Sequence, residues 1–407
     1  MNRRNFIAYN SFLGLSYLSN NLVFSDIKST DENSVIYLFL NGGATHIETF
    51  NPCPNAPSEI RSVTGHIQTS IPGEYIGGLH TEVAKRTNKI AIVRSFNHKD
   101  SNHRSAQHLN LTGGKTIGDG PQTTPSYGAF AAYKFGPNNK GGLPTYIKLN
   151  SHPHTAASSL GQKFAGYDSS PKGLGDLSLK TSVERLNKRR RMLSIVDNNS
   201  LIKESQIAQD YAELREQAIS SLTGNIADIF DIEKDKEYQK FKDNSLGNDL
   251  LKAVRLVEAG SKFVFLSTGG WDMHSNILTG LNSRQVTLDQ YIAKTIDSLY
   301  ERGLSKKTLF VVSTEFGRTY KINVNGGRDH NPRNIPLMLY CDSYDMGRII
   351  GKTNDTASEV IESPFNPDDL TNTILSHLGF KKNERWVGLD GRPHDFISSS
   401  SKNILYS

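Results

Sequence analysis

Six short apolar runs rich in β-favouring residues constrain the fold of this chain more than any other feature. They cover residues 35–40, 89–94, 145–149, 262–267, 308–313 and 335–340. Most are continuous rather than alternating, which is typical of strands buried on both faces of a sheet. Leu250, Val254 and Val257 recur at helical spacing before the fourth run, and Tyr291 and Ile296 do so before the fifth. This alternation predicts an α/β fold with a mostly parallel central sheet flanked by helices.

The length and local composition predict one domain with an insertion. The chain has 407 residues, of which 36% are hydrophobic, and this is enough to bury a large core. Residues from about 182 to 247 are polar, charged and helix-favouring, with few strand signals. We therefore predict a single domain over residues 31–396 that carries a helical insertion, followed by a Ser-rich tail at residues 397–407.

The N-terminus predicts an exported protein. In residues 1–30, Arg3 and Arg4 precede a moderately apolar run that is broken by Asn, Ser and Tyr. Such a run is a poor membrane span but fits a signal peptide, and the paired arginines resemble the twin-arginine type. We expect the twin-arginine export machinery as a partner and a periplasmic or extracytoplasmic location. The alternatives are an uncleaved leader, which would be the only membrane contact, and a cytoplasmic protein whose arginine pair is coincidental.

Charge and cysteine content exclude some classes of function. The formal net charge is +6, or +4 without the two leader arginines (6 minus 2). No dense Lys/Arg patch with interleaved aromatic residues appears, so the sequence does not indicate a nucleic-acid partner. The basic run at residues 188–191 fits the solvated face of a helix. Cys53 and Cys341 are too few for a disulfide framework.

Polar clusters follow four of the predicted strands, where ligands bind in open α/β sheets. The clusters are NGGATHIETF from residue 41, NHKDSNHRSAQH from residue 97, TGGWDMHSN from residue 268 and TEFGRTYKINVNGGRDHNP from residue 314. Glycine lets a chain turn sharply off a strand, so carboxylate and imidazole side chains can converge there. Mixed Asp, Glu and His ligands suit divalent ions, and we predict a site for zinc, manganese or calcium.

Each cluster taken alone also has a structural explanation. Asp272 could cap the following helix while His274 bonds to backbone, and Glu315 and Arg318 could form a structural ion pair. The recurrence of such clusters at four strand ends favours a functional site.

The same segments carry a resemblance to a known family. LFLNGGATHIETFNPCPNAPSEIR, SNHRSAQHLNLTGG, VEAGSKFVFLSTGGWDMHSN and TLFVVSTEFGRTYKINVNGGRDHNP together resemble the domain-of-unknown-function 1501 family. The leader and RWVGLDGRP near the C-terminus fit it as well. This family is placed in the alkaline phosphatase–sulfatase clan. The resemblance implies an alkaline phosphatase-like fold and metal-dependent hydrolysis of an anionic phosphate or sulfate ester.

The resemblance also implies metal-binding residues. Asp272 and His274 match one metal-binding pair, and Glu315 stands near the place of the clan's Asp-His pair. Asp329 and His330 match the last ligand position. These five residues are therefore expected to act as metal ligands.

The end of the first strand departs from the clan's pattern. Asn41 stands where the clan has a metal-binding Asp, and Glu48 stands where this family usually has Asp. We nevertheless expect the glycine pair after Asn41 to turn the chain so that His46, Glu48 and Thr49 face a metal ion and an anionic ester.

The resemblance leaves the nucleophile open. The cysteine signature of sulfatases has no match, because the corresponding positions begin at His103. His103 is a candidate acid, base or phosphoryl acceptor, and Arg318 is predicted to hold the anion. The candidate hydroxyl nucleophiles are Thr45, Thr49, Ser101 and Ser105. The alternative function is an exported, non-catalytic binding protein that keeps the fold without the full metal set.

Overall fold

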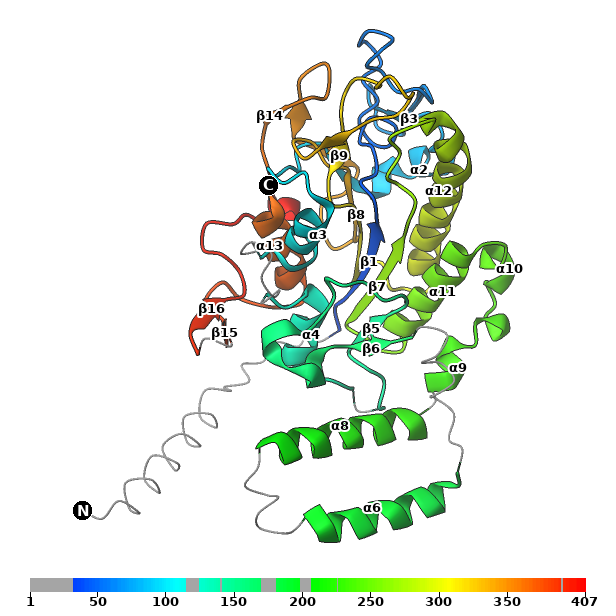
Figure 1. The fold of residues 1–407 in the computed structure, drawn as a ribbon. Helices are drawn as coiled ribbons and strands as arrows, with labels where there is room; N and C mark the ends of the chain where they lie inside the picture. The colour runs from blue at the N-terminus through cyan, green and yellow to red at the C-terminus, as the bar shows by residue number, and fades with distance from the viewer. Residues whose placement is uncertain are drawn as a thin grey trace, which may run out of the picture.

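An eight-stranded sheet forms the centre of the molecule (Figure 1). The computed structural model describes residues 32–114, 124–139, 141–169, 181–197, 206–224, 226–388 and 391–407. The predicted leader, residues 1–30, lies outside the described residues. Among the residues that the structure describes, no helix is both long enough and apolar enough to cross a bilayer.

The strand order of this sheet is β12-β4-β11-β8-β1-β7-β5-β6. The strands are β1 Ser34–Leu40, β4 Ala91–Val93, β5 Tyr146–Lys148, β6 Tyr167–Asp168, β7 Phe263–Thr268, β8 Thr308–Ser313, β11 Leu337–Tyr340 and β12 Arg348–Ile350. Only β11 runs antiparallel to its neighbours, β4 and β8. All six apolar runs lie in this sheet, which confirms the predicted α/β class with a mostly parallel sheet.

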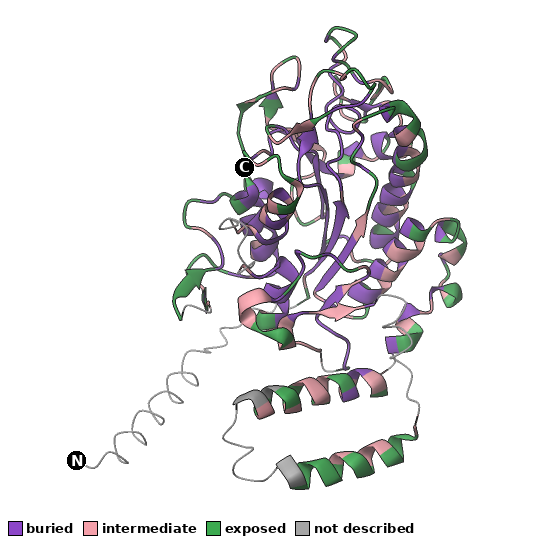
Figure 2. Ribbon diagram, in the orientation of Figure 1, coloured by how far each residue is buried: buried purple, intermediate pink, exposed green. Residues whose placement is uncertain are grey.

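Helices cover both faces of the sheet because both faces are apolar. Along β1, Ile36 and Leu38 belong to one hydrophobic cluster, and Tyr37 and Phe39 belong to the other. The first cluster includes α11 (Ser245–Glu258) and α12 (Ile277–Glu301). The second includes α3 (His103–Thr112), α4 (Tyr127–Phe135) and α13 (Pro367–His377). The central strands are therefore buried on both sides (Figure 2).

Residues 182–247 are mostly helical where the structure describes them, with short turns between the helices. They contain α6 (Val183–Asp197), α8 (Gln206–Thr223), α9 (Ile226–Phe230), α10 (Tyr238–Phe241) and the start of α11. The pair α6 and α8 lies beyond the sheet edge that carries β5 and β6 (Figure 1). The predicted tail, residues 397–407, packs Ile397, Ile404 and Leu405 into the core.

The remaining elements are short. They are α2 (Thr81–Ala84), the 3-10 helices Thr87–Lys89, Ser158–Leu160, Gln162–Phe164, Ile232–Lys234 and Ile404–Tyr406, and four two-stranded sheets: β2 (His66–Gln68) with β3 (Tyr75–Gly77), β9 (Gly317–Arg318) with β10 (His330–Asn331), β13 (Lys352–Thr353) with β14 (Val360–Glu362), and β15 (Arg385–Val387) with β16 (Pro393–Asp395).

His377 gives the fold a predictable dependence on pH. Its Nε2 donates to Ser34 O at 3.0 Å and to Lys307 O at 3.1 Å, and the hydroxyl of Tyr344 contacts its Nδ1. Burial lowers the pKa of His377 to about 4, below the value of about 6.5 for an exposed histidine. The unfolded chain therefore binds more protons between these two values, and stability present above pH 6.5 is lost as the pH falls toward 4.

We expect this group alone to lower the free energy of unfolding by about 2 kcal/mol between pH 7 and pH 5. Denaturant titrations at both pH values would measure the change in the parent and in His377→Gln. In the variant, the free energy of unfolding should no longer show this part of the decrease between pH 7 and pH 5. An unchanged pH dependence in a folded variant would contradict the assignment.

Candidate metal centre

Four side chains from three separate parts of the chain meet at the carboxyl ends of the central strands. Asp272 and His274 lie in the loop after β7, His330 begins β10, and His103 is the first residue of α3. The side chain of Asn102 caps α3 by accepting hydrogen bonds from the backbone N–H groups of the first turn. This cap fixes the position of His103 at the start of the helix. The pairing of β9 with β10 places His330 opposite Arg318.

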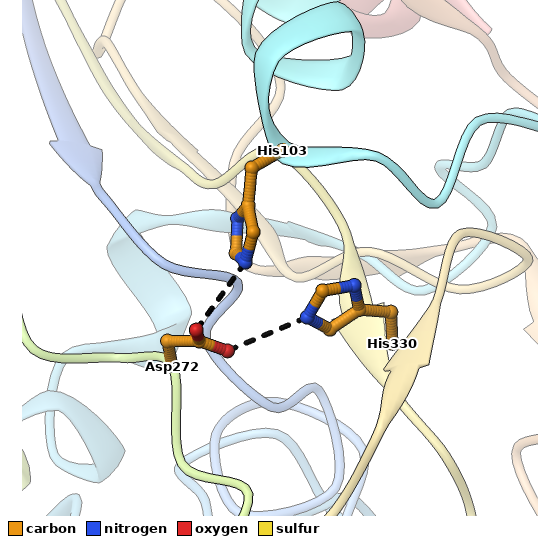
Figure 3. Close-up of side chains that lie close together, drawn as sticks. All are labelled: His103, Asp272 and His330. Atoms are coloured by element: carbon orange, nitrogen blue, oxygen red, sulfur yellow. Dashed lines mark hydrogen bonds and ion pairs between the residues drawn. The ribbon is translucent and has the colours of Figure 1, made fainter.

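These side chains converge on the carboxylate of Asp272. His274 Nε2 lies 2.9 Å from Asp272 Oδ1, and His330 Nε2 lies 3.4 Å from the same oxygen. His103 Nε2 lies 3.4 Å from Asp272 Oδ2 (Figure 3). One ligand atom from each of His103, Asp272 and His330 lies within 4.8 Å of the other two. His274 Nε2 and His330 Nε2 are 3.0 Å apart.

An oxygen atom engages the Nδ1 atom of each histidine. The partners are Glu315 Oε1 for His103 at 2.8 Å, Asp329 Oδ1 for His274 at 2.8 Å and Ser101 O for His330 at 2.9 Å. Each Nδ1 therefore donates, and in the neutral ring Nε2 carries the lone pair. Two facing lone pairs at 3.0 Å repel each other, and a cation or a proton between them would remove this repulsion. Histidines held in this way by oxygen acceptors are typical metal ligands, so the donor set fits a divalent ion.

Glu315 supports the cluster from the interior. It is fully buried, and its Oε1 accepts from Gly42 N at 2.8 Å and from Gln107 Nε2 at 3.0 Å. Burial raises the pKa of Glu315, but hydrogen bonds from His103 and its other donors outweigh burial and hold the pKa below its ordinary value. The hydrogen bond to Glu315 in turn raises the pKa of His103. Both effects favour an ionised carboxylate behind the imidazole.

Arg318 was predicted to hold an anion, and the structure places it against backbone and Asp272. Its Nε donates to Gly43 O at 2.7 Å, and its Nη2 donates to Gly42 O and to Asp272 Oδ1, the latter at 2.5 Å. Gly42 and Gly43 have φ values of 119° and 78°. A Cβ on Gly42 would lie 2.6 Å from the backbone nitrogen of Asp272. The glycine pair is therefore needed to bring these carbonyls to the guanidinium.

The side chains of the other predicted residues at the end of the first strand make structural contacts. His46 Nε2 bonds to Ala357 O at 2.9 Å, and burial lowers the pKa of His46 to about 3. Glu48 is fully buried and pairs with Arg328 Nη2 at 2.8 Å. Thr49 Oγ1 donates to the carbonyl oxygen of Thr45, four residues earlier, at 2.7 Å. Their polar atoms are committed to structural contacts.

The candidate hydroxyls also have local partners. Thr45 Oγ1 donates to Glu48 Oε2 at 2.6 Å, and Ser105 Oγ donates to Asn102 O at 3.4 Å. Ser101 is exposed and reaches the cluster through its backbone carbonyl, which accepts from His330.

Two supporting residues were missed in the sequence. Gln107 Nε2 bridges Glu315 and Asn41 Oδ1, the latter at 2.7 Å. Its spacing of four residues from His103 on a helix could have indicated it, because such positions share one face. No sequence pattern indicated the role of Arg328, because its partner Glu48 is 280 positions away in the chain.

A mostly parallel sheet with a histidine–carboxylate cluster at the carboxyl ends of its strands defines an α/β protein with a candidate metal centre. The chain belongs to the family described as protein of unknown function (DUF1501), whose family model matches residues 32–405. A comparison with curated proteins gave no match.

Solved structures with a similar fold include several hydrolases. A sulfatase from Pseudoalteromonas sp. has 13% identity and a TM-score of 0.44, with 92% of this chain and 72% of the sulfatase covered. A phosphonate monoester hydrolase from Silicibacter pomeroyi has 11% identity and a TM-score of 0.33, covering 86% and 74% of the two chains. The TAB5 alkaline phosphatase has 11% identity and a TM-score of 0.38, covering 86% and 98%.

Proposed function

We propose that this chain is a metal-dependent hydrolase of phosphate or sulfate esters. The proposal rests on one observation: His274 and His330, each held at Nδ1 by an oxygen atom, turn their Nε2 atoms toward each other and toward Asp272. Three protein ligands with room beside them are typical of catalytic metal sites. A divalent ion held by Asp272, His274 and His330 would act as a Lewis acid on an ester oxygen. The nitrogen ligands favour zinc or manganese over calcium, which prefers oxygen.

His103 is the residue that we assign to proton transfer. It lies on the other carboxylate oxygen of Asp272, with its Nε2 3.4 Å away, and its side chain is 34% exposed. Glu315 fixes the ring through Nδ1, as a carboxylate orients a catalytic imidazole. His103 can therefore present Nε2 to a bound ester while the rest of the ring stays fixed.

The test is metal content followed by activity. Elemental mass spectrometry on the purified full chain, supplied with Zn²⁺ or Mn²⁺, should find bound metal. The metal-loaded protein should then hydrolyse a nitrophenyl phosphate or a nitrophenyl sulfate. A folded chain that binds neither ion would overturn the proposal.

The variant His103→Gln separates proton transfer from metal binding. We expect it to retain metal while kcat falls by about 10²–10⁴-fold, the usual contribution of a general acid or base. His274→Gln should instead lose bound metal. If His103→Gln loses metal as completely as His274→Gln, then His103 is a ligand, and the assignment of roles given above is wrong.

A second candidate function is a non-catalytic binding protein. Asn41 favours it, because its amide replaces a carboxylate at the end of β1 and accepts a hydrogen bond from Gln107 instead. A metal-loaded chain that binds phosphate or sulfate esters without hydrolysing them would support this function.

Export by the twin-arginine route is also part of the proposal and is supported by Arg3 and Arg4 in the sequence. A reporter fused to residues 1–30 should be exported in a normal host and retained in a host without the twin-arginine machinery. Retention in both hosts would contradict export.

A further inference from the structure

We propose that Arg318 takes the place of a second metal ion, so that the site holds one divalent ion per chain. This inference rests on the proposed function. The guanidinium lies in contact with two groups that we assign to metal binding: Nη2 is 2.5 Å from Asp272 Oδ1, and Nη1 is 3.3 Å from His274 Nε2. A second ion sharing these ligands would have to occupy the space that the guanidinium fills. It would also be repelled by the positive charge of the arginine.

The arginine is held in place on all sides. Its side chain is 1% exposed. Besides the contacts with Asp272 and His274, Nε donates to Gly43 O, Nη2 to Gly42 O and Nη1 to Arg328 O at 3.1 Å. With Trp271 O, which lies 3.5 Å from Nη2, the five N–H groups of the guanidinium meet four carbonyl oxygens, one carboxylate and one imidazole. Leaving this position would strand the carbonyls of Gly42 and Gly43 in the interior, which is unfavourable.

The nearby groups that could bind a second ion have other partners. Glu315 accepts from Gly42 N, Gln107 and Thr314 in addition to His103. Asn41 offers an amide oxygen rather than a carboxylate, and that oxygen accepts from Gln107.

The third carboxylate near the centre, Asp329, is also engaged. It accepts from His274 Nδ1 and from Asn323 Nδ2, the latter at 3.1 Å. Across the part of the chain that the structure describes, the metal-type side chains that come together in threes belong to this one cluster of His103, Asp272, His274 and His330. The ligands available to the site therefore match one ion and one fixed organic cation.

The number of bound ions tests the inference directly. The full chain is dialysed against excess Mn²⁺, counted by elemental mass spectrometry and examined by electron paramagnetic resonance. We expect one ion per chain and the six-line spectrum of an isolated Mn²⁺ ion. Two ions per chain with an exchange-coupled spectrum, both lost in Asp272→Asn, would overturn the inference and leave the proposed function intact. No bound ion would overturn both.

Two variants test whether Arg318 limits the number of metal ions bound per chain. Arg318→Gln keeps much of the side chain's length and some of its N–H donors but removes the charge, and we expect it to admit a second, weaker ion at excess Mn²⁺. Arg318→Lys keeps the charge and should hold one ion. If a folded Arg318→Gln chain still holds one ion at the highest Mn²⁺ concentration, the arginine does not stand in for a metal. Should Arg318→Gln fail to fold, the spectrum of the parent chain decides by itself.

Discussion

Replacing Glu48 with glutamine is expected to lower the free energy of unfolding by about 3–5 kcal/mol, because it leaves a buried charge without its partner. Glu48 and Arg328 are both fully buried, and two guanidinium nitrogens contact the two carboxylate oxygens at 3.1 and 2.8 Å. Arg328 also donates to backbone carbonyls, including Ile60 O at 3.1 Å. These contacts join residues 48–60 to the segment that carries His330.

Denaturant titration at pH 7 would measure this loss. The matched control is Asp395→Asn, which breaks an exposed ion pair with Arg385. The side chain of Arg385 is 61% exposed, and that of Asp395 is 41% exposed. The control should change stability by less than about 1 kcal/mol, as exposed pairs do. Equal losses in the two variants would show that burial does not set the strength of the Glu48 pair.

The second large effect is expected from Asp272→Asn. His103, His274, His330 and Arg318 all contact this carboxylate, so its removal takes away a metal ligand and the partner of a buried cation. We expect loss of bound metal and a fall in ester hydrolysis of at least about 10³-fold, since a catalytic ion stabilises transition-state charge by several kcal/mol.

Asp329→Asn is the graded control for this experiment. Asp329 contacts His274 Nδ1 and not the Nε2 side of the ring, so the variant should weaken metal binding by about 10–100-fold rather than abolish it. Metal content and thermal unfolding of both variants would separate loss of the ion from loss of the fold. Full metal occupancy in a folded Asp272→Asn chain would exclude Asp272 as a ligand.

The sequence predicted the fold well because continuous apolar strands leave a strong signal. All six predicted runs became strands of the central sheet, whereas β6 and β12 were missed. These two strands are short edge strands of two and three residues, and partly buried residues dominate both. Such strands carry little periodicity, so tertiary pairing rather than local pattern determines them.

The candidate site was only partly predictable for a related reason. Strand ends identified Asp272, His274, His330 and His103, because the carboxyl ends of parallel strands meet at one edge. The partner of Glu48 could not be predicted, since a buried carboxylate that pairs with a distant arginine looks in sequence like a metal ligand. Only the three-dimensional arrangement separates these two uses of the same side chain.

The position of β1 has a consequence for how the chain folds. This first strand lies between β7 and β8, so Val35 pairs with Phe263 and Leu309, separations of 228 (263 minus 35) and 274 (309 minus 35) residues. Contacts of such long range slow folding and leave an apolar segment exposed until late in synthesis. The newly made chain therefore needs protection from aggregation until β8 has left the ribosome. We expect chaperones to bind mainly to its N-terminal third during synthesis.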